Sequence, residues 1–160
     1  MIPYESVLDL IGNTPLVDVS RLSPNPNVRI IAKLENQNPF GSVKDRIAKA
    51  MVEDAEKHGR LMPGQTIVEP SSGNTGIALA AIAQIKGYPI KILMPTSVSI
   101  ERRQMLDIFG AEVILTPGEE GSNGAVARAI EMAKQNPDWC FLYQYANDAN
   151  ARAHYEGTGP

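Results

Sequence analysis

The sequence predicts an α/β protein whose parallel sheet is flanked by helices. Short apolar runs alternate along the chain with segments in which apolar residues recur at helical spacing. A helix-length connection joins each run to the next, as in parallel strands linked by right-handed crossovers. In such sheets, ligands bind beyond the carboxyl ends of the strands, where loops lead into helix N-termini. The candidate functional residues are therefore sought in those loops.

Five apolar segments are expected to be strands, and the four segments between them helices. The strands are predicted at 28–35, 66–70, 90–95, 112–116 and 139–145, and the helices at 42–59, 74–87, around 99–110 and at 122–136. In the first helix, apolar residues recur every fourth position, at Val43, Ile47, Met51 and Ala55. Ser42 with Asp45 resembles a capping box, and Gly59 supplies the stop.

The composition is that of a globular domain and excludes several classes of function. The 160 residues are 43% hydrophobic and 21% charged, and the net charge of -3 does not indicate the basic surface that binds nucleic acid. The single cysteine, Cys140, excludes an intrachain disulfide and suits a reducing compartment. No secretory signal is visible, and no apolar run approaches the ~20 residues that cross a bilayer, so we expect a cytoplasmic protein without a membrane partner. His58 and His154 lack further ligands at metal-binding spacing, so no metal is expected.

A loop of small polar residues follows the predicted strand at 66–70 and opens the next helix. It consists of Ser71, Ser72, Gly73, Asn74 and Thr75. Glycine and hydroxyl residues allow backbone N–H groups to converge at the positive end of a helix, which suits a carboxylate or a phosphate. The alternative is that Ser72 or Asn74 only caps the helix and nothing binds. The loop matches neither the common nucleotide-binding fingerprints nor the serine-hydrolase elbow.

Lys44 lies near the start of the predicted helix at 42–59, behind a Pro-Phe-Gly-Ser turn. An ammonium group is electrostatically unfavourable there, because the first turn of a helix carries the positive end of its dipole. One interpretation is an ordinary solvated lysine. The other is an amine that forms a Schiff base with a carbonyl cofactor, for which pyridoxal phosphate, an electron sink, is the best candidate. Gln144, at the end of the last predicted strand, is placed either to face a ligand or to serve a structural role.

Five motifs, in order over essentially the whole chain, carry a resemblance to a known family. They are GNTPLV (12–17), KLENQNPFGSVKDR (33–46), EPSSGNTGIALA (69–80), MPTSVSIERRQMLDIFGAEVILT (94–116) and HYEGTGP (154–160). Together they resemble the cysteine synthase family, the O-acetylserine sulfhydrylases among the fold type II pyridoxal-phosphate enzymes. The combination of SVKDR with SGNTG is the specific part, and NPFGSVKDR favours the B-type synthase.

The resemblance implies a role for each candidate residue. Lys44 would form the Schiff base and shuttle the α-proton, and Asn74 would bind the phenolic oxygen of the cofactor ring. The substrate carboxylate would be held by Ser71, Ser72, Gly73, Asn74 and Thr75, assisted by Gln144. The implied reaction is β-replacement, in which O-acetylserine or O-phosphoserine and a sulfur donor give L-cysteine. The family also implies a homodimer at full length.

The resemblance implies the amino-terminal half of a tryptophan synthase β-like fold, with an incomplete second lobe. Residues 1–35 would be opening strands of that second lobe, and 36–147 the small lobe that carries the lysine and the substrate loop. Residues 148–160 would begin the return, and the loop for the cofactor phosphate is expected beyond Pro160. Cystathionine β-synthase and serine/threonine dehydratase are neighbouring alternatives. A non-catalytic lobe that binds a partner is an alternative of a different class.

Overall fold

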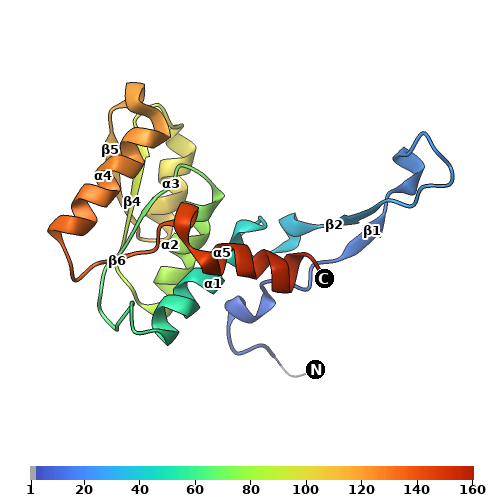
Figure 1. Cartoon of the computed structure of the whole chain (residues 1–160), viewed down its shortest axis with the longest axis horizontal. Helices are drawn as coiled ribbons and strands as arrows, with labels where there is room; N and C mark the ends of the chain where they lie inside the picture. The colour runs from blue at the N-terminus through green and yellow to red at the C-terminus, as the bar shows by residue number, and fades with distance from the viewer. Residues whose placement is uncertain (1–2) are drawn as a thin grey trace.

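A four-stranded parallel sheet forms the centre of the computed structural model, which describes residues 3–160. Its strands are β3 (Ile67–Pro70), β4 (Ile90–Pro95), β5 (Glu112–Thr116) and β6 (Cys140–Phe141), in the spatial order β5–β4–β3–β6 (Figure 1). The chain moves outward from β3 to β5 and then returns to the other side of β3 with β6. The strand order therefore reverses between β3 and β6, and this is the position at which open α/β sheets bind ligands.

Helices cover both faces of the sheet, which confirms the predicted α/β class (Figure 1). They are α1 (Lys44–Lys57), α2 (Asn74–Lys86), α3 (Ile100–Ile108), α4 (Gly121–Gln135) and α5 (Asp148–Ala153). On β3, Ile67 packs into a core with residues of α1, α2 and α3, whereas the next residue, Val68, packs against α4. Successive strand residues point to opposite faces, so one strand holds both layers. No helix among residues 3–160 is long and apolar enough to cross a bilayer.

The predicted element boundaries are close to those observed for the sheet and its helices. β4 and β5 begin and end as predicted, and α1 to α4 differ from the predictions by one or two residues at their ends. Gly87, directly after α2, adopts a left-handed φ of 77°, which a glycine at a helix C-terminus readily accommodates. The remaining short turns are η1 (Val7–Leu10), η2 (Ser20–Leu22), η3 (Glu35–Gln37), η4 (Gly118–Glu120), η5 (Gln144–Ala146) and the π-turn η6 (His154–Thr158).

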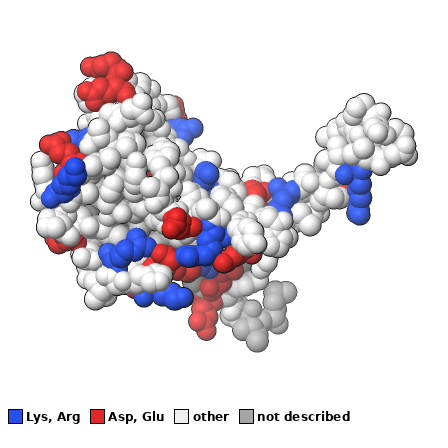
Figure 2. Space-filling model, viewed as in Figure 1, with Lys and Arg blue, Asp and Glu red and all other residues white. Residues whose placement is uncertain are grey.

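The predicted strand at 28–35 does not belong to the parallel sheet. Only Ile31–Lys33 is a strand, β2, and it pairs antiparallel with β1 (Leu16–Asp18) in a hairpin that extends away from the α/β unit (Figure 1). The alternation of strands and helices alone predicted a fifth parallel strand here, which is wrong because the apolar run pairs locally with β1; the family resemblance had placed residues 1–35 outside this sheet. Apolar side chains of the hairpin remain exposed, including Leu16 and Leu22, which is 80% accessible. In Figure 2 the outer end of the hairpin carries few charges, whereas acidic and basic side chains intermingle over the α/β unit.

The predicted strand at 139–145 is also shorter than expected, since β6 ends at Phe141. At Tyr143 the backbone takes a left-handed φ of 49°, which is unusual for a residue with a Cβ. The chain then enters η5, so Gln144 begins a turn and does not lie on a strand, in contrast to the prediction.

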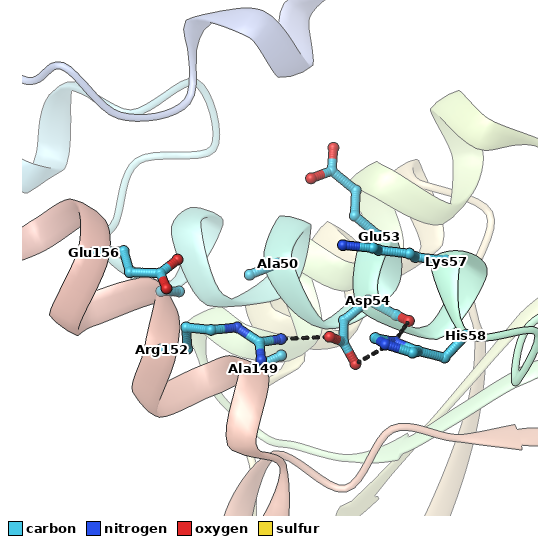
Figure 3. A pocket seen from close by; sticks show the side chains of 9 residues that line it. Ala50, Glu53, Asp54, Lys57, His58, Ala149, Arg152 and Glu156 are labelled. Atoms are coloured by element: carbon cyan, nitrogen blue, oxygen red, sulfur yellow. Dashed lines mark hydrogen bonds and ion pairs between the residues drawn. The ribbon is translucent and has the colours of Figure 1, made fainter.

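After η5, helix α5 packs along α1 and ties the end of the chain to the core. Asp54 of α1 accepts a hydrogen bond from Arg152 of α5, and its carboxylate lies 3.5 Å from the ring of His58 (Figure 3). Asp54 also accepts a hydrogen bond from Arg60. Asp54, His58 and Arg152 line a hollow of about 480 Å³ between the two helices, together with Ala149 and Ala153 of α5.

Candidate functional site

The loop after β3 is held in shape by Ser71. Its hydroxyl oxygen accepts hydrogen bonds from the backbone N–H groups of Gly73 at 3.3 Å and of Gly76 at 3.0 Å. The residue itself is buried, and its own N–H donates to the carbonyl of Leu93 on the neighbouring strand. A Cβ at Gly76 would lie only 3.2 Å from the Cβ of Ser71, so glycine permits the close approach of helix and loop. Ser71 therefore organises the loop from within.

The N-terminus of α2 has free donors. Its N-cap is Gly73, which has no side chain to cap the helix, so the alternative that Ser72 or Asn74 serves as the cap was wrong. Among the described residues, no acceptor receives the backbone N–H groups of Ser72, Asn74 or Thr75. Unpaired N–H groups at the positive end of a helix favour an anion. The side chain of Asn74 is exposed at the same place.

Gln144 is joined to this loop directly. The hydroxyl of Thr75 donates a hydrogen bond to Oε1 of Gln144 at 2.9 Å, and Nε2 of Gln144 lies 3.4 Å from the carbonyl of Pro70. Asn150, on α5, donates to the backbone carbonyl of Gln144 at 2.9 Å. The structure thus brings two of the predicted substrate-binding residues into contact. They meet because β3 and β6 are neighbouring parallel strands, so the segments that follow them leave the sheet at the same edge.

Lys44 is the first residue of α1, two residues after the predicted helix start and thus near the helix N-terminus as expected. Ser42 accepts its backbone N–H at 3.1 Å, while the carboxylate of Asp45 receives the N–H of Phe40 at 2.7 Å. The expected capping box of Ser42 with Asp45 is therefore not formed, since the N-cap is Val43 and the two side chains accept other backbone N–H groups. Lys44 is half-buried, and within the part of the chain that the structure describes its Nζ has neither a hydrogen-bond nor an ion-pair partner.

Lys44 acts electrostatically on His154, which lies in η6. Burial, followed by the charges of Lys44 and Arg46, lowers the pKa of His154, whereas the charge of Glu35 acts in the opposite direction. The ring Nδ1 of His154 lies 2.9 Å from the hydroxyl of Thr158. Residues 154–158 therefore lie within electrostatic reach of the start of α1, although they are far from it in the sequence.

Glu69 is a residue of the site region that sequence reasoning missed. It lies on β3 directly before the loop, its exposure is 0%, and its Oε1 accepts the backbone N–H of Gln144 at 3.0 Å. Burial raises the pKa of its carboxyl to about 7, although hydrogen bonds from Gln144 and Tyr143 act in the opposite direction. The signal was available, because Glu69 is the one charged residue in an otherwise apolar run, TIVEP.

The remaining candidate chemistry lies apart from this loop. The hollow between α1 and α5 in Figure 3 is lined by none of the residues predicted to bind substrate or cofactor. Across residues 3–160, no cluster of three or more histidine, cysteine or acidic residues could hold a metal ion. Cys140 is buried, and burial raises the pKa of its thiol, which does not suit a nucleophile.

The fold is that of an α/β protein with unpaired N–H donors at the switch point of its sheet, and the same chain carries a lysine amine that no described residue engages. The chain belongs to the family of pyridoxal-phosphate dependent enzymes, whose family model matches residues 7–160. This confirms the family expected from the motifs.

The curated relatives are cysteine synthases. The chain is 48% identical over 155 residues to the cysteine synthase of a Flavobacterium strain, and the aligned region covers 97% of this chain and 50% of that protein. It is 49% identical over 150 residues to cysteine synthase B of Escherichia coli, covering 94% and 49% of the two chains. The crystal structure of an O-ureido-L-serine synthase superimposes with a TM-score of 0.92 at 43% identity, covering 98% of this chain and 49% of that one. The chain spans about half the length of the relatives it matches.

The residues present fit the cofactor of this family. A lysine amine that no described residue engages can condense with the aldehyde of pyridoxal phosphate. The exposed amide of Asn74 can hydrogen-bond an oxygen of the ring, and the free N–H groups of the loop suit a carboxylate. These residues therefore fit an aldehyde-bearing cofactor and an anionic ligand.

Proposed function

We propose that the protein carrying this chain forms L-cysteine by pyridoxal-phosphate dependent β-replacement. The ester oxygen on the β-carbon of O-acetylserine or O-phosphoserine leaves with the bonding electron pair, and the sulfur of a donor bonds to that carbon. The single observation that carries the proposal is the free amine of Lys44 in the same chain as a loop of unpaired N–H donors. The names of the relatives support it, since they are cysteine synthases and a synthase of another β-substituted serine.

The loop and Gln144 are proposed to hold the substrate carboxylate. The N–H groups of Ser72, Asn74 and Thr75 are the donors, and Nε2 of Gln144 adds a further one because its contact with Pro70 uses at most one of its two hydrogens. The hydroxyl of Thr75 is engaged by Gln144, so it orients the amide. Ser71 and Gly73 contribute by shaping the loop.

Lys44 is proposed to hold the cofactor and to move the proton. Bound pyridoxal phosphate supplies an electron sink for the α-carbon of the amino acid. Nζ of Lys44 takes the α-proton and returns it at the end of the reaction, for which it must be a free amine during turnover. Asn74 is proposed to contact the ring oxygen of the cofactor.

Reductive trapping tests the assignment of Lys44. The full natural chain is treated with pyridoxal phosphate and borohydride, and the labelled peptide is identified by mass spectrometry. We expect the label on Lys44 and its loss in Lys44→Ala, whereas Lys49→Ala, one turn along the same helix, retains it. Label spread equally over Lys33, Lys49 and Lys57 would refute the assignment.

An activity comparison separates the proposed reaction from its neighbours. Cysteine formation that requires a sulfur donor supports the synthase, whereas release of a keto acid without a donor indicates a dehydratase, and condensation with homocysteine indicates a cystathionine β-synthase. Assays with O-acetylserine against O-phosphoserine, and with sulfide against thiosulfate, define the substrates. A non-catalytic binding lobe predicts no label on any lysine and a stable complex with another chain.

The assembly and location proposed for the protein follow from the same family. We propose a homodimer in the cytoplasm at full length. Sedimentation equilibrium of the full natural chain and fractionation of cells that express it measure the two. A monomer at all concentrations, or recovery outside the cytoplasm, contradicts the corresponding proposal.

A further inference from the structure

A buried carboxyl group lies directly beneath the proposed substrate site. Glu69 occupies the third position of β3, on the same face as Ile67, and is fully inaccessible. Carboxylates are almost never buried without a partner of opposite charge. Within residues 3–160, no lysine, arginine or histidine forms an ion pair with Glu69, and its Oε2 has no hydrogen-bond partner at all. The fold keeps an expensive group here, and its contacts indicate why.

The partner of Glu69 is a backbone group of a strained turn. Its Oε1 accepts the N–H of Gln144 at 3.0 Å, directly after Tyr143. Tyr143 is the residue with the left-handed φ of 49°. Such a conformation persists only where surrounding contacts hold it. Glu69 supplies that contact at the point where the chain leaves β6.

The turn in question sets the position of Gln144. With its N–H fixed by Glu69 and its carbonyl bonded to Asn150, the backbone of Gln144 is held on both sides. Its side chain then reaches Thr75 at 2.9 Å and approaches Pro70. Because β3 carries both Glu69 and Pro70, the strand that leads to the loop also positions the residue that faces the loop.

We infer that Glu69 is a positioning residue, which fixes the Tyr143–Gln144 turn so that the amide of Gln144 meets Thr75 at the carboxylate site. The inference rests on the proposed function only for the identity of the ligand. Glu69 does not touch the substrate, because no part of it is accessible. The required chemistry is a hydrogen-bond acceptor at this position, and a negative charge is not required.

Two substitutions distinguish the role of Glu69 as a hydrogen-bond acceptor from the role of its negative charge. Glu69→Gln keeps an oxygen for the N–H of Gln144, whereas Glu69→Leu fills similar space without an acceptor. Ile67→Val, on the same strand and face, is the matched control for loss of stability alone. We expect backbone hydrogen exchange at Tyr143 and Gln144 to accelerate at least tenfold in Glu69→Leu and to stay within threefold of wild type in the other two variants. Equal acceleration in Glu69→Gln and Glu69→Leu, or none in either, overturns the inference.

Ligand binding supplies a second readout, in the full natural chain loaded with cofactor. L-Serine is the probe, because its hydroxyl is a poor leaving group. We expect its Kd to rise at least tenfold in Glu69→Leu and less than threefold in Glu69→Gln, while Lys44 remains labelled by borohydride in both. Absence of label in the wild type refutes the proposed function alone, because the exchange experiment still decides the role of Glu69.

The wild type provides a measurement that does not depend on the folding of any variant. In a pH titration by NMR, the amide resonances of Tyr143 and Gln144 should shift with the midpoint of the Glu69 carboxyl carbon. Independent midpoints overturn the inference. Cys140 is the other titrating group close to Glu69, and its pKa is raised by burial, so its titration lies well above that midpoint.

Discussion

The hydroxyl of Thr75 donates a hydrogen bond to the side-chain oxygen of Gln144 over 2.9 Å, although 69 residues separate them in the sequence. The contact links the first turn of α2 to the turn after β6. Both ends are anchored separately, Thr75 by the helix and Gln144 by Glu69 and Asn150. The two loops at the switch point of the sheet are thereby one unit, and its parts should respond together to mutation.

A double-mutant cycle measures this coupling. Thr75→Val and Gln144→Met remove the hydrogen bond at nearly constant volume, and each should lower the free energy of unfolding by about 1 kcal/mol. The double variant should lose about 1 kcal/mol less than the sum of the two, because the second change has no partner left to disrupt. Urea unfolding of the four proteins measures the cycle. Strictly additive losses would show that the contact contributes nothing.

The buried carboxyl of Glu69 predicts an unusual dependence of stability on pH. Its pKa rises from 4.5 to about 7 on folding because burial disfavours the charge. The folded state therefore binds the proton more tightly, and this stabilisation is complete below pH 4.5 and is lost as the pH rises through 7. The full effect is about 3 kcal/mol. Unfolding free energies from pH 4 to 8 should fall by this amount in wild type relative to Glu69→Gln, and parallel curves for the two proteins would contradict the shift.

The sequence predicted the α/β layers well because apolar periodicity reports burial, and burial is complete along β3 and from 78 to 83 in α2. The strand predictions failed at 28–35 and 139–145, where equally apolar runs form only short strands. Periodicity does not reveal that β2 pairs with β1, nor that the chain leaves the sheet after Phe141. Those outcomes depend on contacts between distant residues, such as Glu69 with Gln144.

The sequence predicted which residues belong to the candidate site better than it predicted the contacts between them. Lys44 at a helix start and the polar loop were recognisable, because helix ends and small polar runs are local features. The sequence did not reveal that the Ser71 hydroxyl accepts hydrogen bonds within the loop, nor that Thr75 bonds Gln144, since the direction of a side-chain hydrogen bond depends on packing. Whether Lys44, Asn74 and the loop act as proposed stays a prediction for the trapping experiment.

The charge of Lys44 can be followed through His154 without any cofactor. The pKa of His154 is lowered by burial first and then by the positive charges of Lys44 and Arg46. Replacing Lys44 with methionine removes one of these charges, so the pKa of His154 should rise while burial still keeps it below its ordinary value. Titration of the imidazole resonances by NMR measures the change. Lys49→Met is the control, because Nζ of Lys49 bonds the carbonyl of Leu8, and an equal rise in both variants would contradict proximity to Lys44.

An ion pair fastens the segment before α1 to the helix. Arg46 donates from two nitrogens to Glu35 at 2.7 Å each, both side chains are largely buried, and Thr14 donates to the same carboxylate. Arg46→Met would leave that carboxylate without its partner and should lower the free energy of unfolding by roughly 3 kcal/mol. Lysine should rescue it only in part, because an ammonium cannot form the two parallel bonds.

The same pair predicts instability in acid. The hydrogen bonds from Arg46 hold the pKa of Glu35 at about 2, below its ordinary value of 4.5. The stabilisation is therefore present above pH 4.5 and is lost as the pH falls toward 2. Wild type should lose stability relative to Glu35→Gln over that window, as measured by urea unfolding at pH 5 and 3. Glu53→Gln, at an exposed position on α1, should show the wild-type slope.

Gly76 tests whether the loop geometry is as tight as the contacts indicate. Alanine inside a helix is ordinarily more stable than glycine by about 1 kcal/mol. Here the new Cβ would lie 3.2 Å from both the Cβ and the carbonyl oxygen of Ser71, which is itself held by three hydrogen bonds and cannot withdraw freely. Gly76→Ala should therefore lower the free energy of unfolding by roughly 1–3 kcal/mol, as overpacking does.

Gly73→Ser is the control for this substitution. The φ of Gly73, -123°, suits any residue, and a Cβ there would meet only Arg102, at 3.7 Å. Serine is also a good N-cap. If Gly76→Ala proves more stable than wild type while Gly73→Ser is neutral, the loop yields to a methyl group and Ser71 does not fix its shape.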